Sequence, residues 1–128
     1  MDEQQVLELK KNVFYQAGIY LSENGLLAPF GSKIKDGNIK PVGYYNDEED
    51  IVDTKKAISV MRDIFSKEIK DFKSDAAAIA YDVAIMITSD EGNSEKRDAM
   101  CLLLSTNGEE WSEDYYLYSF ADGRCVWD

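Results

Sequence analysis

Apolar side chains recur at steps of three and four in residues 3–24, which is the spacing of one face of an α-helix. The residues on this face are Val6, Leu9, Val13, Ala17, Tyr20 and Leu21. Asp2 is suited to cap the start of the helix, and Asn24-Gly25 tolerates the left-handed backbone that ends one. The pattern therefore predicts a helix from residue 3 to about residue 24.

A second helical pattern begins at Asp50 or Asp53 and runs to about residue 72. Lys67, Lys70 and Lys73 lie near its end, where cations interact favourably with the partial negative charge of a helix C-terminus. Its predicted core face consists of Ile58, Met61, Ile64, Phe65, Glu68 or Ile69, and Phe72. Charge placement and periodicity both predict a helix here.

Between the two helical patterns, Asp36-Gly37-Asn38 separates two short extended stretches, residues 26–34 and 39–45. Gly and Asn tolerate the positive φ angles of tight turns, so this order predicts a β-hairpin. Pro29 and Pro41 cannot donate a ladder hydrogen bond, which predicts an edge position or an irregular step for these strands.

From residue 77 onward, the apolar residues alternate with period two, as in β-strands. In residues 77–88, the odd positions are bulky and the even positions include the small residues Ala78, Ala80 and Ala84. Residues 96–106 are apolar on both faces, as in a central strand, and residues 115–120 form an aromatic strand. Asp122-Gly123 then predicts a turn into a short tail, residues 124–128.

These elements predict an α+β fold and a single domain of residues 1–128. Their order, α-β-β-α-β-β-β, favours an antiparallel sheet of about five strands with both helices in a single layer on one face. The pattern leaves open which face the helices cover. An uncovered apolar face or an exposed edge strand promotes self-association, which favours a homodimer over a monomer.

The chain has 14 Lys and Arg residues against 25 Asp and Glu residues, a net charge of −11, and no histidine. Few basic residues are left to bind phosphate, so we expect no nucleic-acid partner and no membrane partner. Without imidazole, Ser-His-Asp and Cys-His catalytic groups are excluded within this chain. The composition therefore favours a non-catalytic protein.

The N-terminus lacks the basic and apolar regions of a secretory signal, and no apolar run approaches the roughly 20 residues of a membrane span. We therefore expect a soluble, cytoplasmic protein. Cys101 and Cys125 are too few for a disulfide framework or a structural zinc site, which predicts two free, at least partly buried thiols. We predict no metal site and no cofactor.

Two acidic segments carry most of the net charge: residues 46–53 and residues 107–128 contribute −5 each. Where carboxylates accompany aromatic rings, the acids steer a cationic partner and the rings supply buried contact. We therefore expect a basic protein partner, as for an immunity protein or antitoxin that neutralises a basic enzyme. The candidate binding residues are Glu109, Glu110, Trp111, Glu113, Asp114, Tyr116 and Tyr118, together with Asp47, Glu48, Glu49 and Asp50.

Asp82 and Asp98 support an alternative function, because each lies within or at the start of an apolar strand. Paired carboxylates act as acid and base when burial or a neighbouring charge raises one pKa, so a carboxylate- or metal-dependent hydrolase is the alternative. A third hypothesis is a small-molecule sensor with a pocket between the sheet and the helices.

Four segments of the chain resemble a family of small, uncharacterised bacterial α+β proteins with no assigned activity: residues 26–31, 36–39, 77–83 and 96–100. Members have a helix, a hairpin that contains Pro-Phe, a second helix, an Ala-Ala-rich strand ending in Tyr-Asp, and a strand that opens with an Asp-Ala pair. The resemblance covers about residues 10–120 and implies a fold but no activity. The order of elements is also similar to roadblock and profilin-like interaction folds, and a fold by itself does not fix a function.

Overall fold

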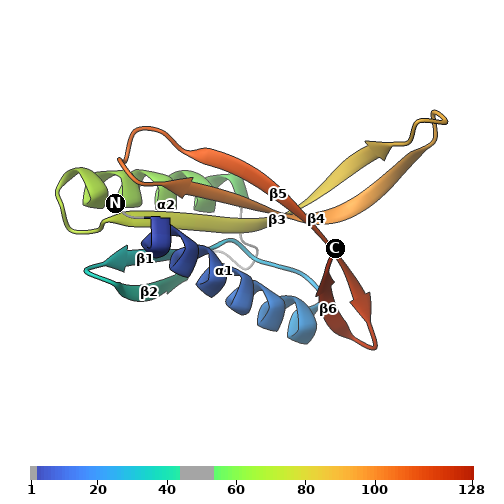
Figure 1. Ribbon diagram of the computed structural model, residues 1–128, viewed down its shortest axis with the longest axis horizontal. Coiled ribbons are helices and arrows are strands. Elements are labelled where there is room, and N and C mark those ends of the chain that lie inside the picture. The colour runs from blue at the N-terminus through green and yellow to red at the C-terminus, as the bar shows by residue number, and fades with distance from the viewer. Residues whose placement is uncertain (1–2, 44–53) are drawn as a thin grey trace.

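The computed structural model describes residues 3–43 and 54–128, and this part of the chain contains two helices and six strands (Figure 1). In chain order they are α1 (Glu3–Asn24), β1 (Phe30–Lys35), β2 (Asn38–Gly43), α2 (Thr54–Lys70), β3 (Ala76–Thr88), β4 (Ser94–Ser105), β5 (Ser112–Ala121) and β6 (Arg124–Trp127). The caps predicted at Asp2, Asp50 and Asp53 lie outside the described residues. Neither helix of the described part is long and apolar enough to cross a lipid bilayer.

The strands form one antiparallel sheet in the order β2-β1-β3-β4-β5-β6, which confirms the predicted α+β class. The predicted tail of residues 124–128 instead contributes the sixth strand. Asp122 and Gly123 have φ angles of 52° and 78°, and two positive values in succession make the tight turn that returns the chain onto β5. Asp36 and Gly37 make the same kind of turn between β1 and β2, as predicted. β2, which contains Pro41, lies at the sheet edge as predicted, whereas β1 begins just after Pro29 and lies between β2 and β3.

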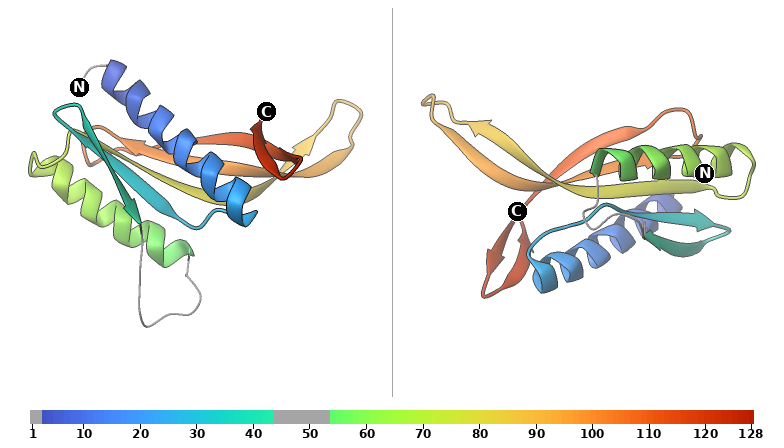
Figure 2. Two further views of the ribbon diagram at one scale, coloured as in Figure 1. Left: turned by 90° about the horizontal axis from the view of Figure 1, so that it is seen from below. Right: turned by 180° about the vertical axis from the view of Figure 1, so that it is seen from behind.

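The prediction that both helices lie on one face of the sheet is wrong, because α1 and α2 cover opposite faces (Figure 2). The first half of β3 is apolar on both sides, so each side needs a cover. On one side, Ala76, Ala78 and Ala80 pack in the cluster that α1 covers. On the other side, Ala77 and Ile79 pack with α2. The sheet is therefore the middle of three layers.

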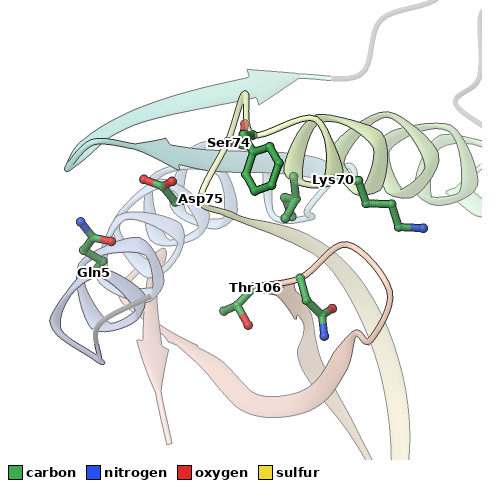
Figure 3. Close-up of a pocket in the computed structure, with 8 residues that line it drawn as sticks. Gln5, Lys70, Ser74, Asp75 and Thr106 are labelled. Carbon is green, nitrogen blue, oxygen red and sulfur yellow. The ribbon is translucent and has the colours of Figure 1, made fainter.

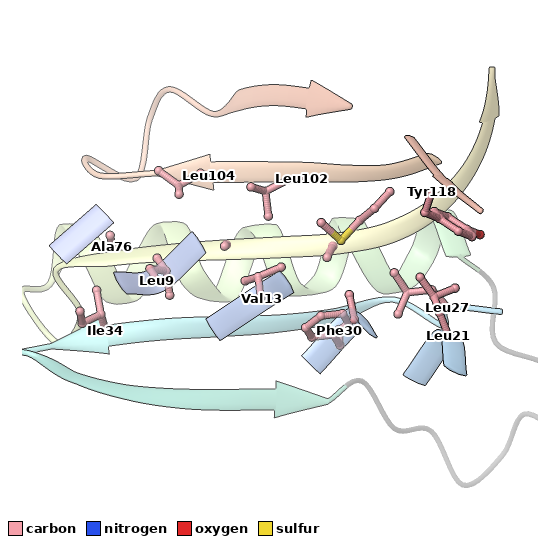
Figure 4. Close-up of a cluster of buried hydrophobic side chains, with 14 residues drawn as sticks. Leu9, Val13, Leu21, Leu27, Phe30, Ile34, Ala76, Leu102, Leu104 and Tyr118 are labelled. Carbon is pink, nitrogen blue, oxygen red and sulfur yellow. The ribbon is translucent and has the colours of Figure 1, made fainter. Parts of the chain in front are cut away.

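The larger of the two cores lies between α1 and the sheet (Figure 4). The alanines of β3 let the helix approach closely, while Leu102 and Leu104 of β4 fill the space beside them. The helix contributes four residues that are at most 1% exposed: Leu9, Val13, Ala17 and Leu21. All four belong to the apolar face that the sequence predicts for the first helix.

α2 packs through a narrow stripe of residues spaced four apart: Ala57, Met61, Phe65 and Ile69. Gly31 of β1 permits this close approach, because a Cβ atom there would lie 2.6 Å from the Phe65 ring. Two residues predicted for this core face do not belong to it. Ile64 lies off the narrow stripe and is 50% exposed, and Phe72 is 83% exposed because the helix ends at Lys70.

At the end of the sheet away from the β1–β2 turn, the strands separate into two ribbons (Figures 1 and 2). The β3–β4 ladder runs to the end of β3, but the β4–β5 ladder stops at the Ala99–Leu117 pair. Beyond this pair, which we call the fork, β3 and β4 form a projecting arm and β5 and β6 form a hairpin. Trp127 of β6 packs edge-to-face on Phe14 of α1, with ring centroids 4.9 Å apart. This contact holds the β5–β6 hairpin on the α1 side of the sheet.

Candidate functional site

Asp82 and Asp98, the two acids of the hydrolase hypothesis, lie on the same sheet face at the fork. In the β3–β4 ladder, Asp82 is opposite Met100 and Asp98 is opposite Ala84. The two acids are therefore diagonal neighbours on the α1 side of the sheet. Asp82 is half-buried, whereas Asp98 is exposed.

Tyr118 joins this group by donating a hydrogen bond of 2.6 Å from its hydroxyl to Asp82 Oδ1. Burial raises the pKa of Asp82, and the Asp98 charge adds to the rise, while hydrogen bonds from Tyr118 and the Leu27 backbone N–H oppose it. Burial and the bond to Asp82 raise the pKa of Tyr118, which therefore remains a neutral donor. The fork thus holds a carboxyl group that takes up a proton more readily than a free aspartate does.

The aromatic and acidic residues predicted as one binding surface lie on opposite faces of β5, because successive side chains of a strand alternate. Tyr116 faces α1, and its ring centroid lies 4.7 Å from that of Phe14. Tyr118 faces the same way and is 3% exposed. This placement corrects the prediction for Tyr118, which has almost no surface to offer a partner and belongs to the core instead.

Trp111 is the residue before β5 and faces α2. Its indole Nε1 donates to Ser66 Oγ at 3.1 Å, and the Arg62 guanidinium lies 5.7 Å from the ring centroid. The ring is half-buried and packs against the cluster beneath α2. Its contacts therefore fasten the β4–β5 connection to the helix.

The other candidate acids of this segment are all exposed: Glu109, Glu110, Glu113 and Asp114. Tyr115, which is not among the candidate residues, is 49% exposed, and its hydroxyl donates to Glu113. No described strand pairs with the outer side of residues 112–117, because β6 pairs with β5 only from residue 118 onward. We call this open margin, together with Tyr115, Glu113 and Asp114 on it and Glu109 and Glu110 in the turn before it, the β5 edge. Strand alternation is the signal that points to Tyr115, since it shares a face with Glu113.

The two cysteines are free thiols, as predicted, and lie on opposite faces of the sheet. Cys101 is buried opposite Tyr81 and Tyr115 of the neighbouring strands, with its Sγ 3.9 Å from Glu113 Oε1. Burial raises the pKa of the Cys101 thiol, and it also raises the pKa of the half-buried Cys125 thiol. Because the thiolate is the nucleophile, both residues are poorly suited to covalent chemistry.

No group of three or more His, Cys, Asp or Glu side chains placed to hold a metal ion occurs in residues 3–43 and 54–128. The acidic candidates of the first segment lie outside these residues: Asp47, Glu48, Glu49 and Asp50. A hollow of about 590 Å³ lies at the end of the sheet away from the fork (Figure 3). It is lined by residues of α1, of the end of α2 and the turn after it, and of the turn after β4, and neither Asp82 nor Asp98 is among them.

Comparison with known proteins gives no match for this chain among protein-family models, curated proteins or solved structures. The resemblance to a family of small bacterial proteins, and to roadblock and profilin-like folds, therefore stays a prediction.

Proposed function

We propose that this protein is a non-catalytic module that binds a basic protein partner along the β5 edge, in the manner of an immunity protein or antitoxin. The observation that carries the proposal is an open strand margin with carboxylates on both faces, Glu113 and Asp114, beside the half-exposed ring of Tyr115. An open margin offers backbone donors and acceptors to an added strand, and the side chains on its two faces supply selectivity.

The distribution of charge supports a basic partner at this place. Residues 76–128 contain eleven acidic and three basic residues, a net charge of −8. Residues 30–43 and 54–75 contain five acidic and nine basic residues, a net charge of +4. Residues 44–53 contribute a further −5, which brings residues 30–75 to a net charge of −1, against −8 for residues 76–128. The larger negative charge of the β3–β6 half favours the approach of a cationic protein to that half.

The contacts within the β5 edge fit a preformed binding surface. Asn107 Oδ1 accepts the backbone N–H groups of Glu109 and Glu110 at 2.9 and 2.8 Å, which fixes the turn and leaves both carboxylates in solvent. The Tyr115 hydroxyl donates a hydrogen bond to Glu113, which lies on the same face of β5. A rigid aromatic ring among acids loses little conformational entropy when a partner covers it.

The experiment compares two variants with equal changes of charge. The edge variant carries Glu109→Gln, Glu110→Gln, Glu113→Gln and Asp114→Asn, and the control variant carries Asp90→Asn, Glu91→Gln, Glu95→Gln and Asp122→Asn. All eight positions are exposed, and each variant removes four negative charges. Wild-type, edge and control proteins are immobilised and exposed to an extract of the source cells at low and high salt.

We expect wild-type and control proteins to retain the same basic protein at low salt and to release it at high salt, because surface charges are screened. The edge variant should not retain it, and the purified partner should bind the edge variant at least about tenfold more weakly. Equal retention by the edge variant, equal loss in both variants, or no salt-sensitive partner at all would contradict the proposal.

A carboxylate-dependent hydrolase is a second candidate, supported by the shared face of Asp82 and Asp98 and by the raised pKa of Asp82. Its test is turnover of 4-nitrophenyl esters, phosphates and glycosides by the wild-type protein. Turnover should be lost in Asp82→Asn and in Asp98→Asn and retained in the exposed control Asp90→Asn. Absence of turnover with all three substrate classes, or turnover that survives both substitutions, rejects this candidate.

A further inference from the structure

The hollow at the end of the sheet away from the fork is formed by three separate parts of the chain (Figure 3). Gln5 comes from α1, Lys70 and Ser74 come from the end of α2 and the turn after it, and Thr106 follows β4. Its volume of about 590 Å³ is within the range of small-molecule sites. None of the β5-edge residues lines this hollow, although its lining residue Asn107 also accepts the backbone N–H groups of Glu109 and Glu110.

Phe72, at this hollow, combines two unfavourable features. Its φ angle is 61°, in the left-handed region that glycine normally occupies at a helix end. Its backbone N–H donates to Ile69 O at 3.1 Å, and the next N–H, of Lys73, donates to Glu68 O at 2.8 Å, so the residue ends α2 in a Schellman-type turn. The Phe72 ring is nevertheless 83% exposed. An aromatic residue that gains no burial in a strained backbone position points to a role outside folding.

Two hydrogen-bond donors accompany this ring. Lys70 lines the hollow and forms no ion pair with any residue of the described chain. Its side chain extends outward from the end of α2 in Figure 3, and its rotatable bonds let the ammonium group turn toward a ligand in the hollow. The Asn107 side chain uses its Oδ1 to accept the backbone N–H groups of Glu109 and Glu110, which leaves its NH₂ group as a donor. A flexible ammonium and an amide NH₂ together suit an anionic group.

Asp75, the acidic residue of the lining, already has a partner for each of its carboxylate oxygens. Asp75 Oδ2 accepts the backbone N–H of Asp36 at 2.9 Å, and Asp75 Oδ1 pairs with Lys35 Nζ at 3.4 Å. The Asp36 hydrogen bond, with Lys35, lowers the pKa of Asp75. Its oxygens are thus engaged on the hairpin side, and Lys70 is left without this carboxylate as a partner.

We propose that this hollow binds a small aromatic anion, with the ring of the ligand against Phe72 and its phosphate or carboxylate group held by Lys70 and Asn107. The ring supplies contact area and an edge-to-face or offset-stacked geometry, and the two donors supply orientation. Neither group suffices alone, because a single surface lysine binds anions weakly and a single exposed ring has little to enclose a ligand.

The probe is phenyl phosphate, titrated into the protein of residues 1–128 and followed by amide chemical shifts. Inorganic phosphate and phenol, each titrated separately, represent the two halves of the probe. We expect phenyl phosphate to shift the signals around Phe72, Lys70 and Asn107 with at least tenfold higher affinity than either half. Shifts confined to other regions, or equal affinity for phenyl phosphate and inorganic phosphate, would overturn the proposal.

Two substitutions separate the site from general surface charge. Lys70→Gln should weaken phenyl phosphate binding about tenfold, because it removes a charge-assisted hydrogen bond. Lys67→Gln, one turn earlier on the same helix and outside the lining, should leave binding unchanged. Equal weakening by both substitutions would show a non-specific charge effect and overturn the proposal.

Replacement of Phe72 gives a readout that a structural role would not produce. Phe72→Gly and Phe72→Asn both suit the left-handed backbone, so each should raise the urea midpoint of unfolding while weakening phenyl phosphate binding at least about fivefold. A lowered midpoint in both variants would mean that the ring supports the fold, and unchanged binding would mean that it does not contact the ligand. Either result overturns the proposal.

Discussion

The hydroxyl of Tyr118 donates a hydrogen bond of 2.6 Å to the carboxylate of Asp82, from a residue 36 positions further along the chain. Tyr118 is the residue immediately after the last β4–β5 ladder pair, Ala99–Leu117. The bond therefore ties the β5–β6 hairpin to β3 at the point where backbone pairing with β4 has stopped. At this point the hydrogen bond from the Tyr118 side chain connects the two ribbons where backbone hydrogen bonds no longer do.

Tyr118→Phe should lower the free energy of unfolding by about 1.5 kcal/mol at neutral pH, because it leaves a half-buried carboxylate without its phenolic donor. Urea denaturation of both proteins measures the change. Tyr116→Phe is the matched control, since its ring packs on Phe14 and its hydroxyl bonds to no residue of the described chain. A loss in the control as large as that in Tyr118→Phe would show that the phenol–carboxylate bond contributes nothing specific.

Asp82 should make stability depend on pH in a defined direction. The pKa of Asp82 is raised in the folded state, chiefly by burial. The contribution of Asp82 to the free energy of unfolding is therefore complete below the unfolded pKa, and it is lost as the pH rises through the folded pKa. Asp82→Asn removes this titration. The free energy of unfolding of Asp82→Asn minus that of wild type should therefore increase between about pH 3 and pH 7, whatever the value of this difference at pH 3.

Urea denaturation at a series of pH values measures this difference. Asp90→Asn, at the exposed β3–β4 turn, reports the effect of removing one negative charge from the surface. A relative stability of Asp82→Asn that falls with pH, or that follows the Asp90→Asn curve, would refute the role assigned to burial of Asp82.

Gly31→Ala should lower the free energy of unfolding by about 2 kcal/mol through overpacking. The added Cβ would lie 2.6 and 2.7 Å from two atoms of the Phe65 ring and 3.2 Å from the Ala78 carbonyl oxygen. Phe65 is 1% exposed and has little room to move. Gly43→Ala, where no atom of the described residues beyond the chain neighbours lies within 4 Å of the added Cβ, is the control and should change stability little. Similar effects at both positions in urea denaturation would contradict the close approach of α2 to β1.

The elements that depend on near neighbours in the chain could be predicted from the sequence. The apolar spacing of residues 3–24 predicts α1 at its observed bounds, and Asp36-Gly37 predicts the β1–β2 turn, because both signals act within a few residues. The same reasoning identifies β3, β4 and β5 to within a few residues.

The assignment of helices to sheet faces could not be predicted, because β3 is apolar on both sides. Its even-numbered alanines and its odd-numbered Ala77 and Ile79 are equally good surfaces for a helix, and only the three-dimensional path of the chain decides between them. Phe72 shows a related limit. Periodicity counts it as core, although the helix has ended two residues earlier and turned the ring outward.

The positions of the candidate site residues depend on strand alternation and strand register. Acidity and aromatic content favour residues 109–118 as a surface, but the alternation of β5 buries Tyr118 and half-buries Tyr116 on the α1 side and leaves Tyr115 exposed on the other side. The proximity of Asp82 and Asp98 depends on the register of the β3–β4 ladder, which the local pattern does not specify.

Trp111 tests whether a candidate binding residue is instead structural. In a double-mutant cycle of Trp111→Phe with Ser66→Ala, we expect a coupling energy of about 1 kcal/mol from urea denaturation, because the indole Nε1 donates to Ser66 Oγ at 3.1 Å. Ser59→Ala, an exposed serine of the same helix, should show no coupling with Trp111→Phe. The loss of the Arg62 contact in Trp111→Phe does not affect the result, because it appears equally in both halves of each cycle. A coupling near zero would mean that the hydrogen bond does not hold the ring, and the indole would then be free to contact a partner beside Glu110, as the sequence predicts.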